Sequence, residues 1–218
     1  MEVNFALSEG CFPSEYVIST YTIPTEAQTM YHSSPKSQLG AIVDVETTGF
    51  SPFRDEIIEL CIILFRMDGN GFAIIEEEYT GLREPVNGIN AAAARVNGIS
   101  WADVCGRDLD HQRVNELIRR ADFFIAHNAS FDRGFITRLF PQAAYKHWYC
   151  SMSGINWRGM GYPNRRLQDL LAWHGIRPDR QHRAEDDVRA TLELLNYCQS
   201  NGRTYLTELL EQKLAKGK

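Results

Sequence analysis

The chain has 218 residues, 44% of them hydrophobic, which suits one globular domain with a buried core and an appendage. Its 23 basic and 28 acidic residues give a formal net charge of −5 at pH 7, and such a balance usually argues against binding to nucleic acid, because phosphate contacts need a basic surface. This argument against binding to nucleic acid is weaker where several acids gather at a metal site, because bound divalent cations invert the local charge.

The cysteines are widely spaced and include no C-x-x-C pair; they are Cys11, Cys61, Cys105, Cys150 and Cys198. This pattern argues against a zinc site and predicts reduced thiols in the core of a cytoplasmic protein. The N-terminal residues combine neither a basic start nor an apolar run, so no signal peptide is predicted. The longest apolar stretches are far shorter than the roughly 20 residues of a membrane span, so we expect no membrane partner.

Polar residues rich in Ser, Thr, Glu and Pro fill positions 1–38. Within them, residues 12–23 could form a short strand or hairpin, and residues 33–37 have the composition of a linker. We interpret 1–38 as an N-terminal extension that is partly disordered or a small hairpin, and the sequence assigns it no role. Residues 39–218 form the predicted main domain.

Three apolar stretches open the main domain. Residues 39–45 and 57–67 are predicted to be buried strands, because they are continuous apolar runs with many β-branched residues. The turn signal Asp68-Gly69-Asn70-Gly71 separates the second strand from a third over residues 72–82. We therefore expect the three strands to form an antiparallel meander.

Helical and extended patterns alternate over the rest of the chain. Strands are predicted at 122–127 and 148–150, and helices at 90–96, 101–108, 111–120, 131–140, 165–174, 184–199 and 203–214. This order of elements predicts an α/β fold with a mixed five-stranded sheet and helices on both faces.

The first acidic cluster is Asp44-Val45-Glu46, at the end of the first predicted strand. Side chains alternate along a strand, so Asp44 and Glu46 point to the same side. Two neighbouring carboxylates repel each other, and a divalent cation that prefers hard oxygen ligands, Mg²⁺ or Mn²⁺, would remove that cost. The segment is equally consistent with an exposed strand end that carries two solvated acids.

The second cluster, at residues 127–132, reads HNASFD and lies where a predicted strand ends and a helix begins. Asn128 or Ser130 is a natural N-cap, which places Asp132 in the first helical turn. An acid at this position interacts favourably with the helix dipole, by roughly 0.3–1 kcal/mol. A purely structural role is therefore the alternative to a role in a site.

The third cluster, at residues 182–187, reads HRAEDD. Helical periodicity predicts that Asp187 faces the core, where an acid must be paired or bound to a metal, and that Asp186 faces water. His182 is predicted to reach over from the loop before the helix. The alternative is an acidic first helical turn that is capped from the loop. The residues that share the side of Asp187 are Thr191, Leu194, Leu195 and Cys198, and those that share the side of Asp186 are Ala190, Glu193 and Tyr197.

Together and in this order, DVETTGF at 44–50, HNASFD at 127–132 and HRAEDD at 182–187 resemble the three motifs of the DEDDh, or DnaQ-like, 3′→5′ exonucleases. The family includes the proofreading epsilon subunit of bacterial DNA polymerase III, ribonuclease T and the oligoribonucleases. The likeness covers residues 39–200. It extends between the motifs, to Val96-Asn97-Gly98-Ile99 and to Arg166-Leu167-Gln168-Asp169-Leu170.

The resemblance implies an RNase H-like fold and a two-metal mechanism with Mg²⁺ or Mn²⁺. The metals would be held by Asp44, Glu46, Asp132 and Asp187. His182 would be the general base that takes a proton from the attacking water, a role that suits imidazole because it ordinarily titrates at about pH 6.5. Water would attack the last phosphodiester of a single strand, and a nucleoside 5′-monophosphate would leave.

The resemblance also implies a pocket for the terminal nucleotide. The residues assigned to it are Thr47 and Thr48, which would hold the nucleotide, and Val96, Asn97, Ile99, His127 and Phe131, which would shape the pocket by stacking and wedging. Asn97 stands where the family commonly has His, which puts one sugar or phosphate contact in doubt. As alternatives, Phe131 and Val96 are ordinary core residues and His127 is a hydrogen-bonded histidine at a strand end.

Arginines crowd the region around the third motif, with aromatic residues between them. Arginine together with aromatic side chains suits binding to a single-stranded backbone and stacking on its bases. Nearby acids dilute the positive charge, so a solvated mixed surface is the alternative. The arginines are Arg158, Arg165, Arg166, Arg177, Arg180, Arg183 and Arg189, and the aromatic residues are Trp157, Tyr162 and Trp173.

Several functional hypotheses stay open. A free-standing exonuclease is favoured over a proofreading subunit that acts only with a polymerase, because residues 211–218 show no obvious segment for binding a polymerase or a sliding clamp. A catalytically inactive nucleic-acid-binding module would have lost metal ligands, and none is lost here; an unrelated metal-binding regulatory domain is the remaining alternative. The Thr-Thr after Glu46 resembles the proofreading branch, so single-stranded DNA is the expected substrate, with RNA, a homodimer and a replication or repair partner left open.

Overall fold

The computed structural model describes residues 38–180 and 182–216. The predicted N-terminal extension falls on residues 1–38, so all but its last residue lies outside the described residues. Its hairpin, its linker and its disorder therefore stay predictions.

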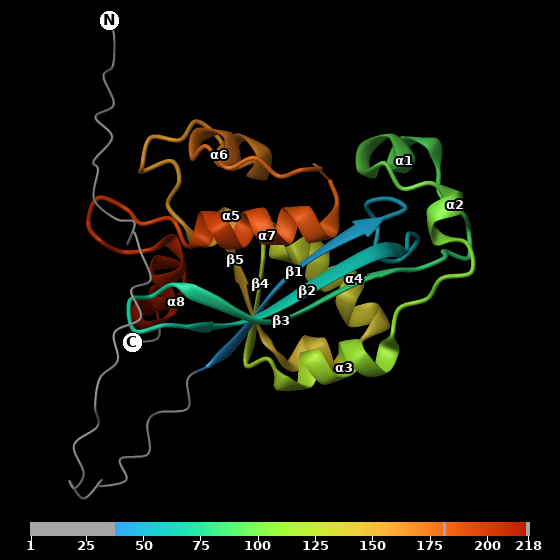
Figure 1. Ribbon diagram of the computed structural model, residues 1–218, viewed down its shortest axis with the longest axis horizontal. Coiled ribbons are helices and arrows are strands. Elements are labelled where there is room, and N and C mark those ends of the chain that lie inside the picture. The colour runs from blue at the N-terminus through green and yellow to red at the C-terminus, as the bar shows by residue number, and fades with distance from the viewer. Residues whose placement is uncertain (1–37, 181, 217–218) are drawn as a thin grey trace, which may run out of the picture. The chain divides into compact units, whose positions relative to one another are not determined.

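Five strands form a single mixed sheet in the order β3-β2-β1-β4-β5 (Figure 1). They are β1 (Leu39–Thr47), β2 (Ile57–Met67), β3 (Ala73–Leu82), β4 (Phe123–Ala126) and β5 (His147–Cys150). The first three pair antiparallel, which confirms the predicted meander, and β4 and β5 add in parallel on the other side of β1. The strand that carries the first acidic cluster is thus the centre of the sheet.

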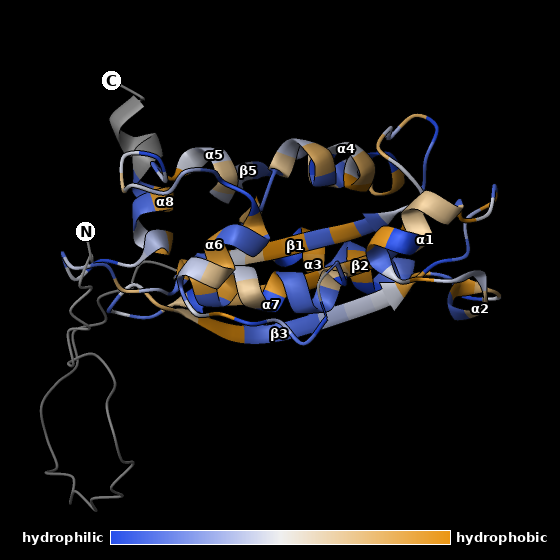
Figure 2. Cartoon of the chain, turned by 90° about the horizontal axis from the view of Figure 1, so that it is seen from above, coloured by the Kyte–Doolittle hydropathy of each residue, from blue (hydrophilic) through white to orange (hydrophobic). Residues whose placement is uncertain are grey.

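The meander follows from its sequence. Every residue from Ile57 to Phe65 is buried, as the continuous apolar run of β2 requires. The turn into β3 forms around Asp68, whose carboxylate accepts hydrogen bonds from the backbone N–H groups of Asn70 and Phe72 at 2.9 and 2.8 Å. Gly71 adopts a left-handed φ of 87°, which glycine tolerates without steric cost. Figure 2 shows hydrophobic residues along β1 and β2 and hydrophilic residues in the middle of β3, which is one of the two edge strands.

Helices cover both faces of the sheet, as predicted. One face packs against α6 (Leu167–Trp173), α7 (Ala184–Leu195) and α8 (Tyr205–Lys216), and the other against α3 (His111–Arg120), α4 (Ala129–Leu139) and the 3₁₀ helix η1 (Pro141–Tyr145). Three short helices complete the described part: α1 (Ala91–Asn97), α2 (Trp101–Val104) and α5 (Ser151–Gly154). Figure 1 shows α7 lying over the sheet on the side opposite α3.

Side-chain alternation in β1 decides which face carries the acids. Ile42 belongs to the core cluster under α7, whereas Val43 and Val45 belong to the cluster under α3 and α4. Asp44 and Glu46 follow Ile42 at a spacing of two, so both lie on the face that α7 covers.

Three predicted helices are shorter in the structure than the sequence indicated: α6 spans only Leu167–Trp173 of the predicted 165–174, and two others end early. The helix predicted over 101–108 ends at Val104, because Cys105 leaves the helical conformation and Gly106 has a φ of 70°. The helix predicted over 184–199 ends at Leu195, because the Asn196 amide pairs instead with the backbone of Ala73 in β3, at 2.7 and 3.1 Å.

The prediction of core thiols is correct for Cys61 and wrong for Cys105, and Cys11 lies outside the described residues. Cys61 is buried in β2, Cys105 is exposed, and Cys150 and Cys198 are half-buried. No disulfide joins any of the described cysteines. None of the helices in the described part of the chain has both the length and the apolar character that crossing a membrane requires.

Candidate active site

Three elements bring the predicted catalytic acids to one edge of the sheet. Asp44 and Glu46 lie near the end of β1, Asp132 lies in the first turn of α4, and Asp187 lies in the first turn of α7. Because β1 and β4 are parallel, their carboxyl ends meet at the same edge, and the helix that follows β4 begins beside Asp44. The predicted position of Asp132 in the first helical turn is confirmed.

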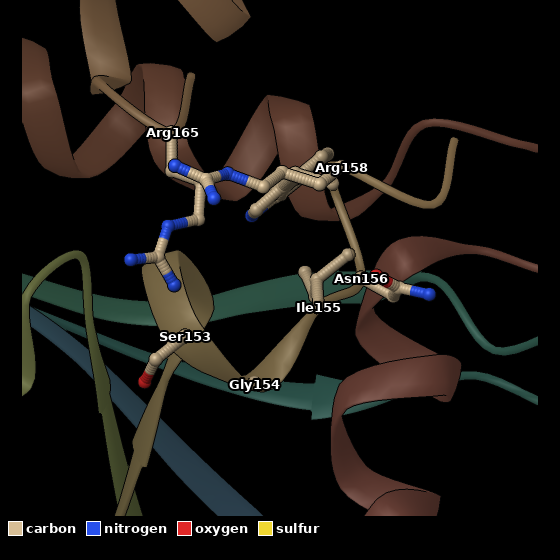
Figure 3. Close-up of a pocket in the computed structure, with 7 residues that line it drawn as sticks. Ser153, Gly154, Ile155, Asn156, Arg158 and Arg165 are labelled. Carbon is tan, nitrogen blue, oxygen red and sulfur yellow. The ribbon is translucent and has the colours of Figure 1, made fainter. Parts of the chain in front are cut away.

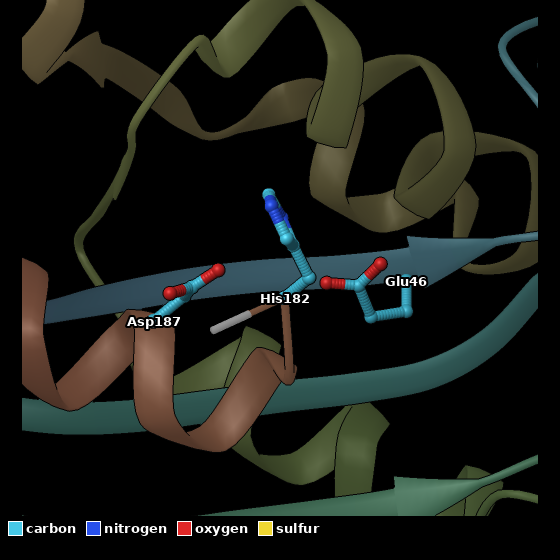
Figure 4. Close-up of side chains that lie close together, drawn as sticks. All are labelled: Glu46, His182 and Asp187. Carbon is cyan, nitrogen blue, oxygen red and sulfur yellow. The ribbon is translucent and has the colours of Figure 1, made fainter. Parts of the chain in front are cut away.

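Glu46, His182 and Asp187 form the most compact group. Each offers one ligand atom, and these three atoms lie within 4.8 Å of one another. Figure 4 shows the Glu46 and Asp187 carboxylates directed toward the space between them, with the His182 ring standing in it. Glu46 is half-buried, Asp187 is buried, and His182 is exposed, so the group opens to solvent on the histidine side.

His182 lies in the loop before α7, as the helical spacing predicted. Its backbone has a left-handed φ of 59°, a conformation that side chains other than glycine rarely adopt and that costs of order 1–3 kcal/mol. Such a conformation persists only where the neighbouring chain is fixed. Hydrogen bonds to a side chain of β2 fix the two residues that follow His182.

Glu59 of β2 provides this anchor. Its side chain is 1% exposed and accepts hydrogen bonds from the guanidinium group of Arg183, from Nε at 3.0 and 3.2 Å and from Nη2 at 2.5 Å. It also accepts the backbone N–H of Ala184 at 2.9 Å. One buried carboxylate therefore holds the start of α7 against the sheet and determines where His182 and Asp187 lie.

The two neighbouring acids of α7 have different partners. Asp187 is 6% exposed, and its Oδ1 accepts a hydrogen bond from the Gln168 amide of α6 at 2.9 Å. The core-facing prediction for Asp187 is confirmed. The prediction that Asp186 faces water is only partly correct, because its half-buried side chain pairs with Arg180 at 2.8 Å.

The site concentrates negative charge where solvent is scarce. Burial raises the pKa of Asp44 well above its usual range, and the charges of Asp132, Glu46 and Asp187 raise it further. Burial likewise raises the pKa of Glu46 to about 8, with the charge of Asp187 as the next cause. Burial also raises the pKa of Asp132 to about 8, although backbone hydrogen bonds, including one from Val45, work in the opposite direction. Without a positive partner, these carboxyl groups retain protons at neutral pH.

The protein itself supplies little compensating charge. Arg183 lowers the pKa of Glu46, but its guanidinium group is engaged by Glu59. Oxygen ligands that are buried, mutually repelling and short of a cationic partner fit divalent metal ions, which prefer such hard ligands. The burial and the charge of the predicted metal ligands therefore fit the binding of divalent metal ions.

A cavity of about 630 Å³ adjoins the carboxylates. Five of the predicted substrate-binding residues line it together with Glu46: Thr47, Thr48, Val96, Asn97 and Phe131. Val96 is 57% exposed, so its alternative as a core residue is wrong. Phe131 packs on Phe135 at the edge of a core cluster and reaches the cavity as well.

Hydrogen bonds fix the polar side of this cavity. The Thr47 hydroxyl donates to the Gly49 carbonyl at 2.6 Å, and the Asn90 amide donates to the Thr48 carbonyl at 2.5 Å. Asn97 is 3% exposed and donates to the Thr47 carbonyl at 3.4 Å. Asn97, which lines the cavity, thus ties α1 to the end of β1.

Two predicted substrate-binding residues do not line the cavity. Ile99 is 1% exposed and packs with Ile58 and Val104 in a small core cluster. The ring nitrogens of His127 lie 2.9 Å from the Ser151 hydroxyl and 2.9 Å from the Arg165 carbonyl, and burial lowers the pKa of His127. These contacts agree with the alternative prediction, in which His127 is a hydrogen-bonded histidine at a strand end.

Glu59, Gln168 and Asn90 contact the site without having been predicted to do so. The sequence signal for Glu59 was available: it is the only charged residue within the otherwise apolar run from Ile57 to Phe65. A buried charge must have a partner. The sequence did not reveal that this partner is Arg183, 124 positions away.

The sheet order and the acidic edge are those of an RNase H-like fold, and comparison with known proteins assigns the family. The exonuclease family model, RNase_T, matches residues 41–195. The chain therefore belongs to the exonuclease family, and its three motifs place it among the DEDDh, or DnaQ-like, members.

Individual relatives are distant. Ribonuclease T of Shewanella frigidimarina is 27% identical over 173 residues, which cover 70% of this chain and 78% of the relative. The PolC-type DNA polymerase III of Thermotoga petrophila is 26% identical over 196 residues, which cover 83% of this chain and 13% of the relative. The solved E. coli exonuclease I in complex with a dT13 oligonucleotide has a TM-score of 0.59 at 18% identity, over 82% of this chain and 42% of that chain. The chain thus spans less than half of the last two proteins.

The raised pKa values predict a characteristic pH dependence for the metal-free protein. Glu46 titrates near 4.5 when unfolded and near 8 when folded, so the folded state binds the extra proton between these values. Stability in EDTA is therefore expected to fall as pH rises through this window, and Mn²⁺ is expected to raise the melting temperature more at pH 8 than at pH 5.

The matched control is Glu46→Gln, which removes the titrating carboxyl group at nearly constant volume. In EDTA at pH 8 this variant should melt at a higher temperature than the unmodified protein, and the two melting temperatures should approach each other at pH 5. A Glu46→Gln variant that is equally destabilised at both pH values would contradict the proposed charge repulsion.

Loss of the Glu59 anchor is expected to destabilise the fold. Glu59→Gln removes the charge that holds Arg183 and should lower the free energy of unfolding by about 1.5–3 kcal/mol, the usual contribution of hydrogen bonds to charged groups. The exposed pair of Arg203 and Glu211 is the control, because Arg203→Gln should cost less than about 1 kcal/mol. Urea unfolding measures both, and equal losses would show that Glu59 has no special role.

Proposed function

We propose that this chain is a 3′→5′ exonuclease that hydrolyses single-stranded DNA and releases nucleoside 5′-monophosphates. The observation that carries the proposal is the convergence of four acids and one exposed histidine beside a cavity of about 630 Å³. Family membership supports the reaction class, and the oligonucleotide bound to exonuclease I supports a single-stranded DNA substrate. RNA is the alternative substrate, because ribonuclease T is a relative of comparable similarity.

The acids are the proposed metal ligands, with two Mg²⁺ or Mn²⁺ ions as the cofactors. The residues that would hold them are Asp44, Glu46, Asp132 and Asp187. When bound, such ions polarise the phosphoryl group and make water a stronger nucleophile. The protein contributes burial and a fixed arrangement: Gln168 orients Asp187, and the backbone of Val45 contributes a hydrogen bond to Asp132.

His182 is the proposed general base. Its ring lies on the solvent side of Glu46 and Asp187, where an attacking water can enter and a proton can leave. A base must lie within hydrogen-bond reach of the proton that it removes, directly or through one water. The position in a loop anchored through Arg183 gives the ring a defined place and leaves it exposed.

The 3′-terminal nucleotide is proposed to occupy the cavity beside Glu46. Phe131 and Val96 offer apolar surface for a base or sugar, and the backbone around Thr47 and Thr48 offers polar groups. Asn97 is one of the residues that line this cavity. Ile99 and His127 are proposed to act indirectly, Ile99 by supporting α1 and His127 by holding the segment before α6.

A second candidate is a proofreading exonuclease that acts only with a polymerase. Similarity to the PolC-type DNA polymerase III of Thermotoga petrophila favours it. The predictions of a cytoplasmic location, a homodimer and a replication or repair partner stay predictions.

The direct test uses single-stranded DNA and RNA oligonucleotides labelled at the 5′ end, incubated with Mg²⁺ or Mn²⁺. We expect a ladder that shortens from the 3′ end, with DNA degraded faster than RNA, and no ladder in EDTA or with Asp44→Ala. A ladder that appears only when a polymerase is added would favour the second candidate. Cleavage that is unaffected by Asp44→Ala would contradict the proposed site.

The roles of the two neighbouring acids in α7 can be separated. Asp187→Asn should reduce turnover by at least roughly 100-fold, because it removes a buried ligand oxygen charge. Asp186→Asn changes the adjacent residue in the same way but affects only the contact with Arg180, so it should retain most of the activity. The reverse ranking would show that Asp186 is the ligand.

Removal of the His182 side chain should affect turnover more than metal binding. His182→Ala is expected to lower kcat by roughly 10²–10⁴-fold, as loss of a general base does. Calorimetric titration with Mn²⁺ should give an affinity close to that of the unmodified protein. A large loss of Mn²⁺ affinity would instead identify His182 as a third ligand beside Glu46 and Asp187.

A further inference from the structure

A second, smaller cavity lies beside α5 and before α6. It measures about 210 Å³, and its lining includes Ser153, Asn156, Arg158 and Arg165. Figure 3 shows the side chains of Arg158 and Arg165 extending from separate parts of the chain toward the same part of this cavity. We call it the arginine cavity.

The two arginines of the arginine cavity belong to the unpaired arginines near the third motif, which in the described chain also include Arg166 and Arg177. Arg180, Arg183 and Arg189 are each paired with a carboxylate. Within the described part of the chain, Arg158 and Arg165 form no ion pair, and both are exposed. Two uncompensated positive charges at one small cavity, in a chain with a net charge of −5, favour an anionic ligand.

Two contacts join the arginine cavity to the catalytic edge. The Arg165 carbonyl lies 2.9 Å from Nε2 of His127, which stands immediately after β4 and five positions before Asp132. Three residues after Arg165, the Gln168 amide donates to the Asp187 carboxylate at 2.9 Å. The segment from Arg165 to Gln168 is therefore held at one end to the residue that follows β4 and at the other end to Asp187.

We propose that the arginine cavity binds a backbone phosphate of the nucleic-acid strand, upstream of the phosphate that is hydrolysed. The inference rests on the proposed function. A cavity of about 210 Å³ is below the size of most small-molecule pockets, which begin at about 300 Å³, so it suits a phosphate group better than a whole nucleotide. Guanidinium groups match phosphate oxygens in geometry and charge, and they bind the backbone without regard to sequence.

The proposal predicts a dependence on substrate length. A dinucleotide without a terminal phosphate contains only the phosphate that is hydrolysed and so offers none to the arginine cavity, whereas a 12-residue oligonucleotide does. Loss of the cavity arginines should therefore weaken the use of the longer substrate alone.

The test compares two double variants of equal net charge. Arg158→Gln with Arg165→Gln removes the cavity charges, and Arg107→Gln with Arg119→Gln removes two exposed arginines of α3 and the loop before it that form no ion pair in the described chain. For the cavity variant we expect KM for the 12-residue oligonucleotide to rise at least about 10-fold, with kcat unchanged and dinucleotide cleavage within about 2-fold. The control variant should change neither substrate by more than about 2-fold.

A binding assay without hydrolysis tests the arginine cavity separately from the proposed exonuclease activity. Fluorescence anisotropy of the labelled 12-residue oligonucleotide in EDTA should show weaker binding to the cavity variant. The slope of log K against log salt concentration should be lower by about 0.7, the value for one lost phosphate contact on a single strand. If the unmodified protein cleaves nothing but binding weakens as stated, the proposed activity fails and the arginine cavity stands. If cleavage is normal and both double variants behave alike, or if the oligonucleotide does not bind, the arginine cavity is not a phosphate site.

Discussion

Mutual repulsion of buried carboxyl groups is the constraint to which the rest of this structure responds. Burial is the largest cause of the raised pKa of Asp44, Glu46, Asp132 and Asp187, and the charges of neighbouring acids raise the pKa of Asp44 and Glu46 further. A fold gains nothing in stability from such an arrangement. It is retained where the charge serves a purpose, and divalent cation binding is the purpose that fits oxygen ligands of this kind.

The architecture supports the acids with rigid elements on three sides. β1 is the central strand: pairing with β2 fixes the position of Asp44 and Glu46, and β4 pairs with β1 just before them, at residues 40–42. The hydrogen bonds between Glu59 of β2 and Arg183 hold the start of α7 against the sheet. A hydrogen bond from Gln168 of α6 holds the Asp187 side chain. His182 alone is exposed and lies in a loop, which suits a group that exchanges protons with solvent. The same support extends through His127 to the segment that carries Arg165.

Local sequence patterns predicted most of the fold and where the candidate metal-binding acids lie in it. The alternation in β1 indicated that Asp44 and Glu46 share a face, and helical periodicity distinguished Asp187 from Asp186. These predictions succeed because each depends on residues within one element. The family resemblance then connected the three clusters.

Pairings between distant segments could not be predicted in the same way. The end of α7 depends on a contact between Asn196 and Ala73, and the partner of Glu59 is Arg183; no local pattern specifies either. Ile99 and His127 were assigned to the nucleotide pocket by position in a motif, but their side chains are directed into a core cluster and a hydrogen-bond network. The division of the arginines into paired and unpaired groups likewise emerges only once the chain is folded.

The central claim is that the carboxylates hold two metal ions, and anomalous diffraction from crystals grown with Mn²⁺ tests it most directly. We expect two manganese peaks among Asp44, Glu46, Asp132 and Asp187, with both peaks lost in crystals of Asp44→Ala. No peak at these residues, or a single peak bound by Glu46, His182 and Asp187 alone, would contradict the two-metal site and the role of His182 as the base.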